Sequence, residues 1–195
     1  MGELQDRELI FVFTGPDGSG RKTVADSVGT TFGIPKVVSY ATRKPRSGEI
    51  DGQDYHFISA EQYAEMEGRD EFIESVALHN CRYGLRRDDI EHSFQQDGCI
   101  YLIVNPEGAE ILKQLYGHHV IRIFIYADRA TVAEREERQG LSQELIQDHL
   151  SHYAAAMAYQ SACEHAFENY DLAHTVFDIT NTLEAYLQRN LVERD

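Results

Sequence analysis

The most constraining feature of the sequence is an apolar run that ends in a glycine-rich loop and continues into a helical stretch. Residues 9–13 are continuously apolar, which predicts a strand buried on both faces of a parallel sheet. The loop that follows contains Gly15, Gly18 and Gly20, and glycine adopts the backbone conformations of such a loop easily. Residues 21–31 then have the pattern of a helix. Because a helix N-terminus and successive backbone N–H groups attract an anion, this unit predicts a phosphate-binding loop.

The second half of the chain alternates apolar runs with helical stretches. Residues 99–104 and 120–126 predict two more buried strands, and Pro106 is well placed to begin a helix between them, over residues 106–116. The charged composition of residues 129–139 is typical of an exposed helix or lid. We then expect a long helix over 142–169, a last strand over 175–179 and a closing helix over 183–191. This alternation predicts an α/β fold with a doubly wound parallel sheet and helices on both faces.

Residues 34–86 interrupt the alternation and predict a small antiparallel lobe inserted into the main fold. Ser59 is expected to cap a short helix, with Gln62 at the capping-box position. Residues 71–76 and 82–84 are expected to form short strands around a turn at His79, Asn80 and Cys81. The predicted organisation is therefore a core of residues 1–33, 87–126 and 170–195, a lobe of residues 34–86, and a lid with the long helix over residues 127–169.

Composition limits the classes of protein to which the chain can belong. Its 195 residues are 42% apolar, enough for one domain of ordinary size with a small inserted lobe. A formal net charge of -15 argues against binding of duplex nucleic acid, which needs an extended Lys/Arg surface. We expect neither a signal peptide nor a membrane span. The three cysteines lack the paired spacing of zinc or disulfide frameworks and are expected to be reduced thiols of a cytoplasmic protein.

A basic cluster stands out in this acidic chain. Arg43, Lys44 and Arg46 fall within four positions and create a local positive field where the overall charge would repel an anion. A solvated turn is the alternative, because Pro45, Ser47 and Gly48 are ordinary turn residues. The cluster favours a small anionic ligand, since two guanidinium groups can surround a phosphate with charge-assisted hydrogen bonds.

The stretch around this cluster resembles the GMP-binding signature of guanylate kinases. The family pattern is Ser-x-x-Thr-Arg-x-Pro-Arg-x-Gly-Glu-x-x-Gly-x-Asp-Tyr. This chain matches it with Ser39, Thr42, Arg43, Pro45, Arg46, Gly48, Glu49, Gly52, Asp54 and Tyr55. A match of this length is specific, and the resemblance to guanylate kinases extends over most of the chain.

The resemblance implies a P-loop nucleoside-monophosphate-kinase fold and a reaction in which ATP phosphorylates GMP. It implies GMP and ATP as small-molecule partners and Mg²⁺ as a cofactor. Glu74 and Tyr83 occupy positions that contact the nucleotide in the family, and a buried carboxylate can accept the N1 and N2 hydrogens of guanine side by side. Asn105 is a further candidate for a hydrogen bond to the ligand. The residues expected to bind GMP are Ser39, Arg43, Arg46, Tyr55, Glu74, Tyr83 and Asn105.

The positions that would serve ATP and magnesium depart from the family pattern. The phosphate-loop pattern Gly-x-x-x-x-Gly-Lys-Ser/Thr would place lysine at 21 and a hydroxyl at 22, but the chain has Arg21 and Lys22, and the hydroxyl arrives at Thr23. The family's Asp-x-Asp after the central strand corresponds to Ile103 and Asn105. Since Mg²⁺ favours charged oxygen ligands, no metal-ligand set is predicted.

The lid also departs from the family in its arginines. Arg135 matches the first of them, whereas the second falls on Gln139 with Arg138 displaced by one position. His149 stands at the arginine of the family's Ile-x-x-Arg-Leu run. Phosphoryl transfer depends on positioning and charge neutralisation, so these changes matter for rate. The residues left to serve catalysis are Arg21, Lys22, Arg135 and Arg138, and those of the phosphate loop are Gly15, Gly18, Gly20, Arg21 and Thr23.

Three functions remain open from the sequence. The first is a guanylate-kinase-like protein that binds GMP and has weak or no phosphotransfer activity. The second is a fully active guanylate kinase. The third is a non-catalytic module on the guanylate kinase fold that binds a protein partner. The matching signature and the altered donor side favour the first.

Overall fold

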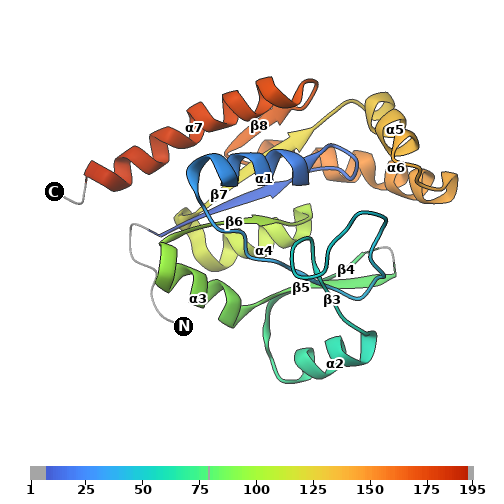
Figure 1. Ribbon diagram of the computed structural model, residues 1–195, viewed down its shortest axis with the longest axis horizontal. Helices are drawn as coiled ribbons and strands as arrows, with labels where there is room; N and C mark the ends of the chain where they lie inside the picture. The colour runs from blue at the N-terminus through green and yellow to red at the C-terminus, as the bar shows by residue number, and fades with distance from the viewer. Residues whose placement is uncertain (1–7, 79, 193–195) are drawn as a thin grey trace.

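The computed structural model describes residues 8–78 and 80–192, and its centre is a parallel sheet (Figure 1). All neighbouring strands in this sheet run parallel, as the apolar runs predicted. The order across the sheet is β6, β1, β7, β8. Their bounds are Leu9–Thr14 for β1, Cys99–Ile103 for β6, Val120–Tyr126 for β7 and His165–Glu168 for β8.

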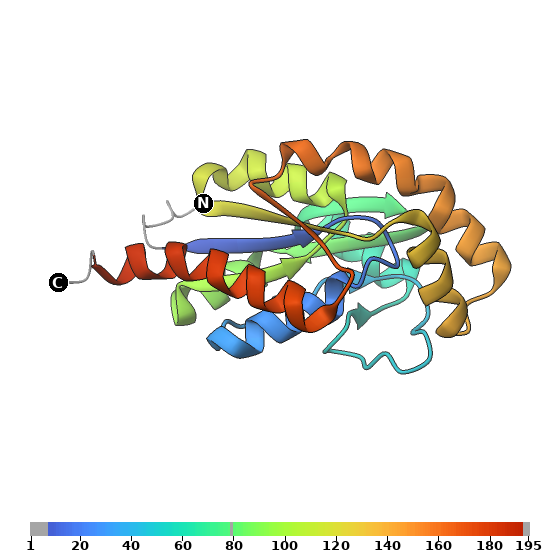
Figure 2. The same cartoon turned by 90° about the horizontal axis from the view of Figure 1, so that it is seen from above.

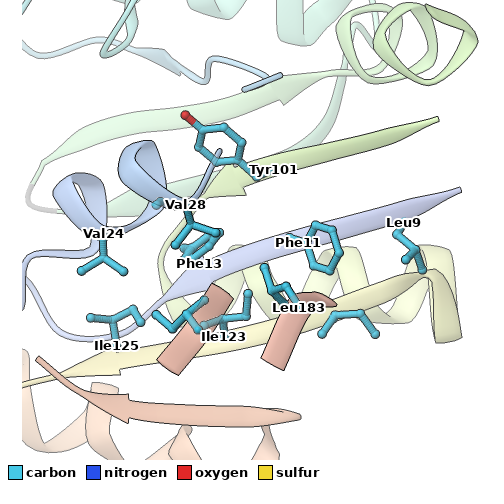
Figure 3. Close-up of a cluster of buried hydrophobic side chains, with 12 residues drawn as sticks. Leu9, Phe11, Phe13, Val24, Val28, Tyr101, Ile123, Ile125 and Leu183 are labelled. Carbon is cyan, nitrogen blue, oxygen red and sulfur yellow. The ribbon is translucent and has the colours of Figure 1, made fainter. Parts of the chain in front are cut away.

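Helices cover both faces of the sheet, with α1 and α7 on one side and α4 on the other (Figure 2). Phe11 and Phe13 point from β1 into the cluster under α1 and α7 (Figure 3). Ile10 and Val12 join the opposite cluster, to which α3 and α4 contribute. β1 is therefore buried on both faces, which explains its unbroken apolar sequence. The helices are α1 (Arg21–Phe32), α3 (Arg87–Asp97), α4 (Pro106–Tyr116) and α7 (Leu172–Val192).

A second, smaller sheet lies beside the carboxyl end of β6. Its order is β3, β2, β5, β4, and the β2–β3 pair is parallel while the other two pairs are antiparallel. The prediction of an antiparallel lobe is therefore wrong for this pair. The long segment between β2 and β3, which holds all three residues of the basic cluster, returns the chain in the same direction. The bounds are Tyr40–Ala41 for β2, His56–Phe57 for β3, Phe72–Leu78 for β4 and Cys81–Arg86 for β5.

The helix of this smaller sheet follows the predicted capping pattern. In α2 (Ala60–Gly68) the Ser59 hydroxyl accepts from the Gln62 backbone N–H, and the Gln62 side chain accepts from the Ser59 N–H. The capping box is therefore confirmed. Of the predicted turn between β4 and β5, His79 lies outside the described residues, and Asn80 has a positive φ of 59°.

The expected helix over residues 142–169 is wrong in its second half. α5 (Arg129–Arg138) leads into α6 (Gln143–Ala158), which is followed by one short helix and a strand of the core sheet. After η2 (Gln160–Ala162) the chain forms β8, which pairs with β7 from Ile123 to Tyr126. Pairing with a long, fully buried neighbour outweighs the helical preference of a four-residue segment. A further 3₁₀ turn, η1 (Gly117–His119), joins α4 to β7.

The predicted strand over residues 175–179 is also wrong, because this segment lies inside α7. Thr175, Ile179 and Leu183 are all buried and recur every four residues, which is the spacing of one helix face. The Thr175 hydroxyl bonds the Asp171 carbonyl one turn earlier, at 2.8 Å. The β-branched Thr175, Val176 and Ile179 favour a strand locally, whereas the longer helical period decides the structure. No helix among the described residues is long and apolar enough to cross a bilayer.

Candidate nucleotide-binding site

A cleft opens between the carboxyl ends of the parallel strands and the smaller sheet. It encloses about 620 Å³ of space, part of which is open to solvent. Ligands of α/β proteins commonly bind at this edge of the sheet. We call it the central cleft. All seven residues expected to bind GMP line it, namely Ser39, Arg43, Arg46, Tyr55, Glu74, Tyr83 and Asn105.

Glu49 organises the two arginines of the cleft. Its carboxylate accepts from Arg43 Nη1 at 2.6 Å and from Arg43 Nη2 at 2.7 Å, and it also accepts the Arg46 backbone N–H at 2.7 Å. Burial opposes ionisation of Glu49, but these bonds outweigh it and hold the pKa of the carboxyl below its usual value. The sequence signature includes Glu49 without assigning it a role. The structure shows that Glu49 fixes the Arg43 side chain and the turn that begins at Arg46.

Aromatic rings support the same side of the cleft. The Arg43 guanidinium lies 4.9 Å from the ring centroid of Tyr55 and 5.4 Å from that of Phe57. The rings of Tyr55 and Tyr83 meet edge to face with centroids 5.7 Å apart. Burial raises the pKa of Tyr83, so its phenol keeps its proton and can donate a hydrogen bond. Hydroxyl donors and guanidinium groups therefore converge at one end of the cleft.

Glu74 has a different environment within the cleft. It comes from β4, is only 4% exposed, and has Val76, Ile103 and Val104 as neighbours along the cleft wall. No hydrogen bond or ion pair reaches its carboxyl group from the described part of the chain. Burial, together with the charge of Glu107, raises the pKa of Glu74 to about 8.

Space for the Glu74 carboxyl depends on Gly108 in α4. A Cβ atom added at Gly108 would lie 2.6 Å from Glu74 Oε1. Glycine at this position lets the first turn of α4 approach the carboxyl this closely, since a Cβ atom there would displace the tip of the Glu74 side chain. Asn105, which caps α4, accepts the Gly108 N–H on its Oδ1 at 2.8 Å. The start of α4 is thereby fixed against the cleft.

We expect Glu74→Gln to stabilise the free protein at alkaline pH. Because the pKa of Glu74 is raised above that of an unfolded glutamate, the folded state holds a proton that the unfolded state releases, and stability is lost as pH rises from about 4.5 through 8. The amide removes this loss, which is on the order of 2 kcal/mol at pH 9 after allowance for relaxation around the buried charge. Urea unfolding at pH 5, 7 and 9 measures it. Glu91→Gln, at an exposed glutamate of α3, should follow the parent profile. A Glu74→Gln variant whose unfolding free energy changes with pH in parallel with that of the parent would contradict the expectation.

The predicted phosphate loop forms between β1 and α1. Gly15, Gly18 and Gly20 all have positive φ values, of 137°, 71° and 87°. A Cβ atom at Gly15 would lie 2.0 Å from the Ile125 carbonyl oxygen, so the loop passes too close to β7 for any other residue. Its backbone therefore requires the glycines that the sequence pattern indicated.

The same loop is braced from its outer side by two residues. Asn169, which follows β8, donates its Nδ2 to the Ser19 carbonyl at 2.8 Å. Arg135 of α5 donates to the same carbonyl at 3.4 Å and to the Asn169 carbonyl at 2.6 Å. Sequence reasoning missed Asn169 because it placed the residue at the end of a long helix. Arg135, expected to serve catalysis, is engaged in this brace.

Comparison with known proteins identifies the family. The model of the guanylate kinase family matches residues 7–186. The chain belongs to the guanylate kinase family. It is 27% identical to a guanylate kinase of Fusobacterium nucleatum, over 90% of this chain and 95% of the relative. It is 30% identical to one from Desulfotalea psychrophila, over 84% and 82% of the two chains.

A solved structure supports the same conclusion for the fold. The crystal structure of guanylate kinase from Anaplasma phagocytophilum superposes with a TM-score of 0.74 at 25% identity, and the match covers 91% of this chain and 85% of that one. Together with the parallel core sheet, this confirms the predicted P-loop nucleoside-monophosphate-kinase fold. Members of the family bind GMP and ATP and normally use Mg²⁺ with ATP.

The guanylate kinase fold places the three candidate residues at the start of α1 in different surroundings. Arg21 lines the central cleft, where its guanidinium donates to Asp17 Oδ1 at 2.7 Å and to the Val104 carbonyl at 3.3 Å. Lys22 instead forms ion pairs with Asp26 and Asp54, both at 2.9 Å, and lines a smaller neighbouring pocket. Thr23 is exposed on α1. Of the three side chains, Arg21 is the one that borders the cleft.

The lid residues are likewise bound to protein groups. Arg138 pairs with Glu134 on the exposed surface of α5, at 2.5 Å. His149, at the family's arginine position, is buried and its Nδ1 lies 2.6 Å from Glu136 Oε1. His149 also lines a second pocket, between α6 and the phosphate loop, whose wall includes Asp17 and Arg21.

The oxygen ligands at the carboxyl end of β6 do not fit a magnesium site of the expected family type. Ile103 has no ligand atom, and the Asn105 side-chain oxygen already caps α4. Asp17 is the carboxylate of the phosphate loop, but its Oδ1 is held by Arg21. Across residues 8–78 and 80–192, no three His, Cys, Asp or Glu side chains are grouped to hold a metal ion. No step of a reaction is therefore derived through a metal.

Proposed function

We propose that this member of the guanylate kinase family binds GMP in the central cleft and transfers phosphate from ATP weakly or not at all. The observation that carries the proposal is the contrast between the two sides of the site. The seven residues expected to bind GMP share one cleft. Lys22, Thr23 and Arg138 of the donor side border no part of it in the described structure.

On the GMP side, each group has a physical role. Arg43, Arg46 and the hydroxyl groups of Ser39, Tyr55 and Tyr83 would bind the dianionic phosphate, because charge-assisted hydrogen bonds are the strongest available. Glu74, in its ionised form, would accept the N1 and N2 hydrogens of guanine. The buried apolar side chains around Glu74 strengthen the selection of guanine, since a base without these two donors would leave polar groups without hydrogen bonds there.

On the ATP side, three of the four positive groups are bonded to protein groups and do not line the central cleft. Lys22 is paired with two carboxylates, Arg138 with one, and Arg135 with two carbonyl groups. Phosphoryl transfer gains most of its rate from cations placed around the transferred group, each worth roughly 10³-fold or more. Loss of several such groups supports weak or absent transfer.

A fully active guanylate kinase is the second candidate. It is favoured by family membership and by Arg21, whose positive charge borders the cleft next to the phosphate loop. Arg21 differs from the usual lysine in shape, since a planar guanidinium does not replace a compact ammonium among phosphate oxygens.

One pair of measurements tests the proposal. We expect GMP to raise the thermal unfolding temperature, while ATP with Mg²⁺ has little effect and ADP formation from ATP and GMP stays near background. Turnover at rates ordinary for kinases, about 1–100 s⁻¹, would favour the second candidate. Absence of a GMP shift would contradict both and leave a protein-interaction module.

A further inference from the structure

The segment between β2 and β3 supplies three of the residues that line the central cleft, namely Arg43, Arg46 and Tyr55. Bonds inside the segment give it its shape, and one of them joins the Asp54 carboxylate to the Ile50 N–H at 2.7 Å. In the described part of the chain, one ion pair joins the segment to α1, between Asp54 Oδ1 and Lys22 Nζ at 2.9 Å. The position of the segment relative to α1 therefore depends on that ion pair.

Asp54 is placed to transmit this contact to the cleft. Its side chain is 7% exposed, whereas that of Lys22 is 56% exposed. Burial opposes ionisation of Asp54, but bonds from the Ile50 N–H and Lys22 outweigh it and hold the pKa of the carboxyl below its usual value. Tyr55 follows Asp54 directly and lines the cleft. A shift of Asp54 would therefore move Tyr55 with it.

The other end of the contact is anchored in the parallel sheet. Asp26, one turn further along α1, accepts from Lys22 Nζ on its Oδ2 at 2.9 Å. Its Oδ1 accepts the Tyr101 hydroxyl at 2.8 Å and the Lys36 ammonium at 3.1 Å. Tyr101 belongs to β6, which pairs with β1. Lys22 is thus held by a carboxylate that is itself fixed, and its ammonium lies between two acids.

An ordinary surface pair is the alternative role for Lys22. Lys22 and Asp26 are four positions apart on α1, and exposed pairs at this spacing contribute little to stability. Such a pair would not involve a third group, yet the same ammonium also reaches Asp54 in the smaller lobe. A largely buried carboxylate is destabilised when its cation is removed. The second contact therefore favours a role in holding two parts of the molecule together.

We propose that Asp26, acting through Lys22, positions the segment that binds the GMP phosphate. This inference rests on the proposed function, which assigns the phosphate to Arg43, Arg46 and the hydroxyl groups beside them. Neither Asp26 nor Lys22 is among the described residues that line the central cleft. Both are therefore positioning residues, which act on the ligand through Asp54.

The expected size of the effect depends on the fraction of molecules in which the segment is in place. A protein that is ready for its ligand only part of the time binds with an affinity lowered by that fraction. Because Lys22 is half exposed, Lys22→Met should weaken GMP binding modestly, about fivefold. Lys22→Arg keeps a cation that can bond two carboxylates, so it should restore most of the affinity. Guanosine, which has no phosphate, should bind the parent and the variants equally.

Calorimetric titrations with GMP and with guanosine test this inference. Asp26→Asn and Asp54→Asn should each weaken GMP binding, as Lys22→Met does. The double variant Lys22→Met/Asp54→Asn should lose no more affinity than the weaker-binding single variant, because the two changes remove the same contact. Arg69→Met is the matched control, since Arg69 pairs with Glu65 on the exposed surface at the end of α2 and its loss should leave the GMP affinity unchanged.

Backbone hydrogen exchange in the free protein is a second measurement, and it needs no ligand. The amides of residues 50–56 should exchange faster in Lys22→Met than in the parent, in Lys22→Arg or in Arg69→Met. Urea unfolding should show little change in global stability for Lys22→Met, because the ion pair is half exposed. A local change in exchange without a global loss of stability is the result expected of a positioning residue.

The outcomes separate the two proposals. Equal GMP affinity and equal exchange rates in the parent and in Lys22→Met would overturn the inference and leave the proposed function intact. Additive losses in the double variant would also overturn it, because Lys22 would then act independently of Asp54. Failure of GMP to bind the parent protein would instead reject the proposed function, and the inference with it.

Discussion

Replacement of Arg122 by methionine is expected to destabilise the protein by about 3 to 5 kcal/mol. Arg122 lies on β7 and is 7% exposed. Its guanidinium donates to Glu164 at 3.1 Å, to Glu110 at 3.0 Å and to the Tyr159 hydroxyl at 2.8 Å, and it also bonds the Ala162 carbonyl. Methionine fills a similar volume but removes the donor that these acceptors share, leaving Glu164 with Lys113 and Glu110 with the Tyr159 hydroxyl. Urea unfolding near pH 7 measures the loss.

Two comparisons identify the hydrogen-bond network of Arg122 as the cause of the expected loss of stability. Arg138→Met removes an exposed pair with Glu134 by the same substitution, and it should change stability by less than about 1 kcal/mol. Burial opposes ionisation of Glu164, but bonds from Arg122 and Lys113 outweigh it and lower its pKa to about 2. The parent should therefore lose stability as pH falls from about 4.5 towards 2, and Arg122→Met should lose less there. Equal effects of the two methionine variants would contradict this account.

Replacement of Arg46 by alanine is expected to weaken GMP binding by about 2 kcal/mol, or roughly thirtyfold in Kd. Arg46 is exposed and lines the central cleft, so its loss removes a donor to the phosphate without disturbing a packed core. Arg43 is a poorer choice for this experiment, because it also pairs with Glu49 and stacks on Tyr55. Calorimetry at fixed ionic strength measures the change.

Lys44→Ala supplies the matched control. Lys44 is exposed, carries the same charge two positions away, and is not among the described residues that line the cleft. It should lower the affinity only slightly, through the local field, and neither variant should change the unfolding temperature appreciably. An equal loss in both variants would mean that Arg46 contributes only general charge. Unchanged affinity in Arg46→Ala would remove it from the GMP site.

The elements predicted best from sequence are those whose structure depends on local or strongly periodic signals. β1 and β7 are buried on both faces. The unbroken apolar run of β1 and the apolar run of β7, which only Arg122 interrupts, located them. Pro106 marked the start of α4, and Ser59 with Gln62 marked that of α2. The signature around Arg43 and Arg46 gathered residues that share one cleft, because a short segment with fixed turns supplies most of them.

The elements predicted badly depend on contacts that are distant in the sequence. β8 is a strand because β7 pairs with it, and no apolar period in residues 165–168 indicates this. Thr175 and Ile179 belong to a helix because one face of α7 packs on the sheet. The brace of Asn169 on Ser19 joins positions 150 residues apart, which no local pattern could have revealed.

The positions of Lys22 and Asp54 have a consequence for any attempt to rebuild the family's phosphate-loop pattern by mutation. Asp54 belongs to the GMP signature, and its side chain is 7% exposed; it accepts from Lys22 and from the Ile50 backbone N–H. A Lys22→Ser change, which restores the family's hydroxyl in the phosphate loop, therefore also removes the cation next to Asp54. Asp54 would keep the Ile50 N–H but lose its ion pair with Lys22, so a change made in the phosphate loop also alters the GMP signature.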